Sequence, residues 1–161
     1  MIRIALIASI VISTVSFAWG YWQAGFEGTA WISGFGIFWL LAYWRKWRWF
    51  SVPAVFASLF LAALGIWLER HPGWMFNGAV FAIFAYDLVE FQRKLNALPE
   101  REDVPGKTRR HILRISLMAA AGLTCVSLFI FLTGQFTNDW GLFLLSAALL
   151  GCAQVLAWRK R

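Results

Sequence analysis

Charge is scarce in this sequence. Only 14% of its 161 residues are charged, and eight of them are acidic. A soluble domain averages about 25% charged residues, so this chain has too few to cover a surface that faces water. Apolar side chains make up 60% of the chain, and its mean hydropathy is +0.63. The shortage of charge therefore excludes a soluble domain and predicts that lipid covers the surface.

Residue types that bind metals or perform catalysis are also scarce. The chain has two cysteines, Cys125 and Cys152, and two histidines, His71 and His111. Both cysteines lie in apolar runs, without a second cysteine or a histidine at metal-ligand spacing, which excludes a secreted disulfide framework. No H-E-x-x-H, G-x-S-x-G or P-loop motif occurs. We therefore expect no enzyme activity, no cofactor and no metal site.

Long apolar runs fill most of the chain. Because about 20 apolar residues cross a bilayer core of roughly 30 Å, these runs predict six transmembrane helices in one integral membrane domain, 1–161. The expected helices are 4–22, 29–44, 50–68, 74–94, 112–132 and 140–158, and the polar segment 95–111 is the expected cytoplasmic loop. The expected fold class is all-α, a polytopic bundle of six helices.

Two of the expected helices resemble each other. At one constant offset, Trp31 corresponds to Trp74 and Tyr43 corresponds to Tyr86. Both helices are the second of a hairpin, so three stacked helical hairpins are one possible arrangement. Whether these hairpins are a true internal repeat stays open.

Basic residues predict the orientation of the helices. With six spans, both termini, the turn at 45–49 and the segment 92–111 share one side. That side holds every one of the 15 lysines and arginines except Arg70. Because positive charge marks the cytoplasmic side, we expect both termini in the cytoplasm. The plasma membrane is the expected location, because a short chain without targeting features is compatible with it. The net charge of +7 then reflects topology, and no nucleic-acid partner is expected.

Tryptophans predict where the helices end. Their rings favour the two membrane–water interfaces, where the apolar ring meets lipid and the N–H meets water. In the expected topology the eleven tryptophans all fall at one of these boundaries, except Trp39. The predicted interface anchors include Trp31, Trp74, Trp140 and Trp158.

Two acidic residues lie inside the apolar run 74–94. Glu90 has Arg93 and Lys94 at i+3 and i+4, so it is predicted to be an ion-paired acid at the interface. Asp87 has no basic residue at those positions. An acid at the centre of a bilayer costs about 2.5–3.5 kcal/mol, so it is normally paired or functional. Asp87 is therefore the principal candidate for a functional residue.

The partner of Asp87 must come from Tyr86, from water or from another helix, and Gln154 is one candidate. Three interpretations of Asp87 stay open: a structural bond between helices, a proton or cation site, and recognition of a partner subunit.

For the whole chain, the sequence favours a non-catalytic accessory or assembly subunit that acts through helix packing. The alternative is a small oligomeric transporter or channel that uses Asp87. The expected partners are the lipid bilayer and either other membrane proteins or further copies of this chain.

Overall fold

A computed structural model describes residues 2–23, 25, 27–47, 49–96, 104–132, 138, 140, 141 and 144. Five α-helices make up most of this part, which contains no strand. They are α1 (Ile2–Gln23), α2 (Thr29–Trp44), α3 (Ser51–Trp67), α4 (Pro72–Asn96) and α5 (Val104–Leu132). The predicted all-α fold is therefore confirmed for these residues. Most of the predicted sixth helix, 140–158, lies outside them.

Three of the helices are long and apolar enough to cross a membrane. The candidate spans are Ile2–Gln23, Pro72–Leu95 and Leu113–Leu132. Helices α2 and α3 are also apolar, but they are shorter, with 16 and 17 residues. A helix that spans the hydrocarbon core needs about 20 residues. Length and composition therefore support three membrane spans directly.

The structure differs from the prediction at the segment 95–111. Helix α4 continues to Asn96, and α5 begins at Val104. Pro105 favours this early start, because a proline in the first turn of a helix lacks only an N–H that would have no helical partner. Residues 104–111 are therefore helical, and His111 lies on α5 rather than in a loop.

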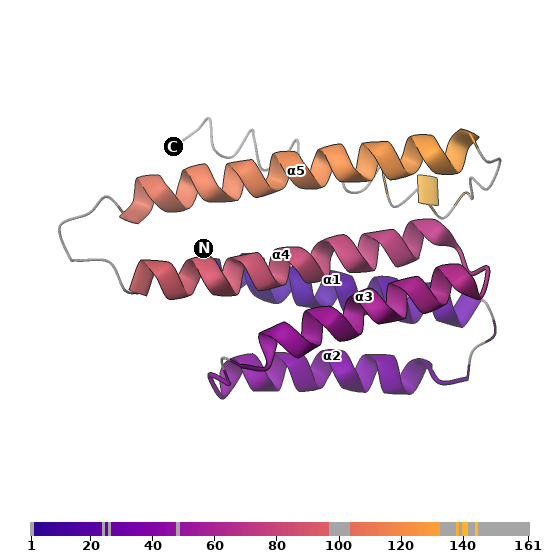
Figure 1. Cartoon of the computed structure of the whole chain (residues 1–161), viewed down its shortest axis with the longest axis horizontal. Helices are drawn as coiled ribbons and strands as arrows, with labels where there is room; N and C mark the ends of the chain where they lie inside the picture. Colours follow the sequence, from indigo (N-terminus) through magenta and orange to yellow (C-terminus); the bar gives the residue numbers. More distant parts are fainter. Residues whose placement is uncertain are drawn as a thin grey trace.

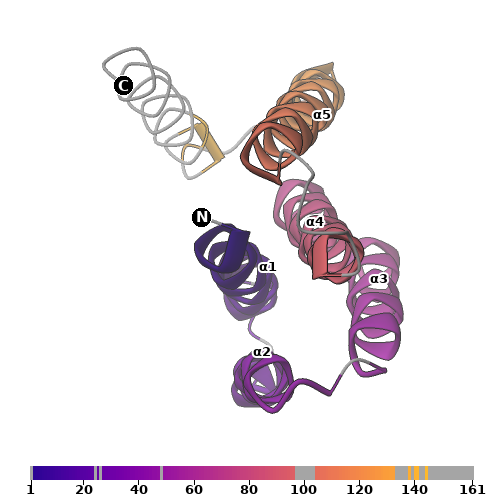
Figure 2. The same cartoon turned by 90° about the vertical axis from the view of Figure 1, so that its left-hand side faces the viewer.

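Neighbouring helices run antiparallel along the molecule (Figure 1). Helices α1 and α4 share the most extensive interface, while α2 packs mainly on α1 and α3 packs mainly on α4. Direct contact between α2 and α3 is slight. Two hairpins, α1–α2 and α3–α4, are thus joined through α1 and α4, and α5 lies beside α4 (Figure 2).

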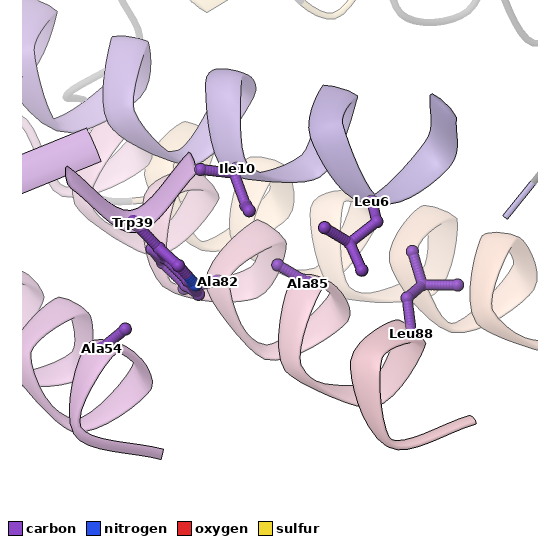
Figure 3. Packing of buried hydrophobic residues seen from close by; sticks show 7 residues of the cluster. All are labelled: Leu6, Ile10, Trp39, Ala54, Ala82, Ala85 and Leu88. Atoms are coloured by element: carbon purple, nitrogen blue, oxygen red, sulfur yellow. The ribbon is translucent and has the colours of Figure 1, made fainter. Parts of the chain in front are cut away.

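Trp39 of α2 fills the core among three alanines, as Figure 3 shows. The side chain is 2% exposed and clusters with Ala54, Ala82 and Ala85. These small side chains on α3 and α4 leave room for the indole, which satisfies the close packing of a protein interior. The other buried members of the cluster are Leu6, Ile10 and Leu88. The one tryptophan predicted away from both membrane boundaries is therefore a core residue.

Small residues let α1 approach α4 closely. Ser13, Ser16 and Gly20 recur at intervals of three or four residues, so they share one helix face, and all three are buried. On the α4 side, a Cβ added to Gly78 would lie 2.7 Å from the ring of Phe17. Close approach of this kind supplies the van der Waals packing that holds helices together in lipid.

Candidate functional site

Asp87 on α4 faces His111 on α5. His111 Nε2 lies 2.8 Å from Asp87 Oδ2. The imidazole also stacks on the ring of Phe91, with 3.8 Å between the ring centroids and 14° between the planes. Phe91 is one helical turn beyond Asp87, so the histidine ring lies against α4 with its edge near the carboxylate. The structure thus pairs the predicted acid with a residue of the next helix.

This contact is short but not a directed hydrogen bond. His111 Nε2 makes no hydrogen bond within the described part of the chain, despite its closeness to the carboxylate. The imidazole instead lies nearly parallel to the Phe91 ring, with 14° between the planes. The two groups form an ion pair only when the imidazole carries both of its protons. The Asp87 side chain is 45% exposed and that of His111 is 23% exposed, but the His111 Nε2 atom itself is buried.

Glu90 lies one turn closer to the carboxyl end of α4. Its Oε1 accepts a hydrogen bond of 2.7 Å from Arg93 Nη2, an i,i+3 pair. Lys94 is exposed beside it. On the opposite side of α4, the hydroxyl of Tyr43 donates to Gln92 Oε1 at 3.3 Å, which ties α2 to this end of α4. The two acids therefore differ in kind, because Glu90 is paired within its own helix and Asp87 meets another helix.

The other predicted members of this site are not gathered around Asp87. Tyr86 is exposed, and the close partner of Asp87 is His111. Gln154 lies outside the described residues. Sequence reasoning missed His111 because it assigned that residue to the end of a loop. Pro105 permits a helix to start there, but a polar, proline-containing segment is also typical of a loop, so no local signal places His111 on α5.

A second polar cluster lies deep between α1 and α4, and sequence reasoning missed it. Asn77 is fully buried, and its Nδ2 donates to Ser16 Oγ at 2.6 Å. The Ser13 hydroxyl donates to the carbonyl oxygen of Gly78 at 2.8 Å. The spacing of the serines along α1 was the available signal, because it places them on one helix face. These bonds connect the two central helices of the apolar bundle, while Asn77 Oδ1 is buried without a hydrogen-bond partner among the described residues.

The predicted tryptophan anchors occupy two different environments. Trp31 is 85% exposed at the start of α2. Trp74 and Trp140 are buried, and their rings meet edge to face with centroids 5.5 Å apart. Trp158 lies outside the described residues. The ring of Trp31 is thus exposed, whereas the rings of Trp74 and Trp140 pack against each other.

The arrangement offers little for metal or ligand chemistry in the part of the chain that the structure describes. Within it, no three residues of the His, Cys, Asp and Glu types come close enough to hold a metal ion. A shallow hollow of about 220 Å³ between α4 and α5 is lined by Phe76, Cys125, Val126 and Phe129. Its lining is almost wholly apolar, so it suits hydrocarbon rather than a polar substrate.

Comparisons of the chain with models of known families, with curated proteins and with solved structures find no match.

Proposed function

We propose that this chain is a non-catalytic, six-span protein of the plasma membrane, with both termini in the cytoplasm. It acts as an accessory or assembly subunit through contacts between helices in the bilayer. Support for the membrane location comes from the three long apolar helices. Large apolar side chains on α1 and α5 are exposed, with Ile4, Phe129 and Leu132 at 73%, 56% and 81% exposure.

The observation that carries the proposed role is the contrast between α5 and the four helices before it. Polar groups inside α1–α4 bond to one another, as in the pair Asn77–Ser16 and the bond from Tyr21 to the carbonyl of Leu61. Among the side chains of α5 that the structure describes, most of the apolar ones are exposed. A packed bundle of four helices beside a helix with an exposed apolar face suits a protein that binds a partner within the membrane. The exposed large side chains of α5 are Leu113, Leu117, Met118, Leu128, Phe129, Phe131 and Leu132.

Co-purification tests this role. The tagged chain is extracted from its own membrane in a mild detergent, and the mass of the complex is measured. An assembly subunit emerges with a stoichiometric membrane partner or as a defined homo-oligomer. Leu117→Arg, on the exposed face of α5, is expected to release the partner, whereas Phe56→Arg, on the exposed face of α3, retains it. A wild-type chain that emerges as a lone monomer contradicts the proposal.

A small transporter or channel is the second candidate, and the contact between Asp87 and His111 favours it. Acid and imidazole groups inside membrane helices are the residue types that carry protons in pumps and transporters. In this chain the half-exposed Asp87 carboxylate lies 2.8 Å from the His111 imidazole.

Proton flux tests the second candidate. The purified chain is placed in liposomes that enclose a pH-sensitive dye, and Asp87→Asn is compared with Glu90→Gln. A transporter loses its flux with the first change and keeps it with the second, because Glu90 is already paired with Arg93. Equal flux in the wild type and Asp87→Asn would eliminate Asp87 as the carrier.

A further inference from the structure

The turn between α2 and α3 combines exposed cations with exposed indole rings. Arg45 and Lys46 are both exposed. Three tryptophans flank them in the sequence, with exposures of 79% for Trp44, 43% for Trp47 and 69% for Trp49. Among the described residues, Arg45 and Lys46 take part in no ion pair. The turn therefore presents positive charge that no acid of the described chain neutralises.

Lys46 occupies a backbone conformation that normally belongs to glycine. Its φ is 57°, in the left-handed region, which costs an L-residue roughly 1–2 kcal/mol. The Lys46 N–H donates to the carbonyl of Tyr43 at 3.0 Å, and the Trp47 N–H donates to that of Ala42 at 2.9 Å. This pair of bonds is the Schellman cap of a helix end, in which glycine is the usual residue. A lysine held there against its backbone preference points to a use for its side chain.

The end of α3 has the same cap with the opposite charge. Glu69 has a φ of 54°, its N–H donates to Ile66, and the Arg70 N–H donates to Gly65. The two caps lie at opposite ends of the bundle, because α2 and α3 are antiparallel (Figure 1). Lys46 therefore occupies the usual glycine position of the cap at the end of α2, and Glu69 occupies that position at the end of α3.

Charge on the described residues follows the same division. The end that holds Lys46 also holds the start of α1, the end of α4 and the start of α5 (Figure 1). Its exposed basic residues outnumber its acids, Asp87 and Glu90. They are Arg3, Arg45, Lys46, Arg93, Lys94, Arg110 and Arg114. This end therefore complements a negatively charged surface.

We propose that the α2–α3 turn binds the phosphate of an anionic phospholipid. The guanidinium of Arg45 and the ammonium of Lys46 supply the charge. The surrounding tryptophans fit the headgroup level, where an indole meets both lipid and water. The three exposed indoles favour a lipid over a soluble acidic partner, because indoles beside cations are typical of a membrane interface. The inference rests on the proposed location of the helices in a bilayer.

Native mass spectrometry of the full chain tests this site. The detergent-solubilised protein is titrated with phosphatidylglycerol and, separately, with phosphatidylcholine. The wild type is expected to bind phosphatidylglycerol more tightly. Arg45→Gln with Lys46→Gln is expected to weaken that binding about 30-fold, because each basic residue near an anionic surface contributes about a factor of five. Binding of phosphatidylcholine is expected to change little.

Two further variants separate a lipid site from charge alone and from folding. Arg93→Gln with Lys94→Gln removes the same charge at the same end, but Arg93 is already paired with Glu90. We expect a loss below about threefold. Lys46→Gly relaxes the backbone while removing the ammonium, so its thermal stability is expected to equal or exceed that of the wild type. Its affinity for phosphatidylglycerol is expected to fall about fivefold.

Three results would overturn the proposal. The first is an equal loss in the two double variants, which indicates diffuse charge rather than a site. The second is unchanged affinity in Arg45→Gln with Lys46→Gln. The third is a wild-type chain that fails to enter lipid nanodiscs, which contradicts the bilayer location and the lipid site together. Normal nanodisc entry with either of the first two results rejects the site alone.

Discussion

Helix α4 packs against α1 and against α5, and the two interfaces use different chemistry. Toward α1 it contributes Asn77 and Gly78, which are cross-linked by hydrogen bonds to Ser16 and Ser13. Toward α5 it contributes Asp87, half exposed beside His111. Within one apolar 18-residue window of each span, 44% of the residues are buried in α4 and 33% in α1, against 6% in α5. Helix α4 therefore forms a buried, hydrogen-bonded interface with α1 and a more exposed interface with α5.

Removal of the core indole should have the largest effect on this comparison. Trp39→Ala leaves a cavity among Ala54, Ala82 and Ala85, and we expect it to lower the free energy of unfolding by about 3–5 kcal/mol. Trp31→Ala is the matched control on the same helix, and its effect is expected to stay below about 1 kcal/mol because Trp31 is 85% exposed. Denaturant titration in detergent micelles measures both. Similar losses would show that Trp39 is not a core residue.

The two glycines of the comparison should respond in opposite ways to a methyl group. Gly78→Ala sets a Cβ 2.7 Å from the Phe17 ring, and we expect a cost of about 1–3 kcal/mol. Gly122 of α5 has nothing within 4 Å of its added Cβ. Gly122→Ala is therefore expected to be neutral or stabilising, since alanine is the better helix former. Thermal unfolding of both variants checks the sign, and a tolerated Gly78→Ala would refute the close approach of α1 and α4.

A hydroxyl provides the smallest test. The Tyr21 hydroxyl donates to the carbonyl of Leu61 at 2.7 Å, linking α1 to α3. Tyr21→Phe is expected to cost about 1 kcal/mol. Tyr86→Phe, at an exposed position of α4, should change stability by less than about 0.5 kcal/mol. Equal effects of the two changes would indicate that the bundle does not use its internal hydroxyls for stability.

Hydropathy was enough to predict an all-helical chain, because the length of an apolar run and the absence of charge within it are local properties. The same local reading separated Glu90 from Asp87, since i,i+3 spacing to Arg93 is visible in the sequence. It also placed Trp39 apart from the other tryptophans, although its role as a core residue needed the alanines of two distant helices.

The contacts between helices could not be predicted in the same way. Ser16 and Asn77 are 61 residues apart, and nothing local indicates which helix faces which. The partner of Asp87 was missed for a different reason. His111 follows a polar, proline-containing segment that is typical of a loop, and only packing along α4 shows that the helix begins before it. Gly34 and Gly36 lie only two residues apart on α2, yet their surroundings differ. A Cβ added to Gly36 would meet the Thr14 side chain of α1, whereas one added to Gly34 would have nothing within 4 Å. The sequence of α2 alone does not show which of the two glycines faces α1.

Two parallel double-mutant cycles test the central claim most directly, namely that α1 and α4 form a closed core to which α5 is only loosely joined. One cycle combines Ser16→Ala with Asn77→Ala, and the other combines Asp87→Ala with His111→Ala. We predict a coupling energy of about 1 kcal/mol for the buried pair, in the range of hydrogen bonds between membrane helices. For the half-exposed pair we predict less than about 0.5 kcal/mol. A coupling between Asp87 and His111 that equals or exceeds the coupling between Ser16 and Asn77 would contradict the account.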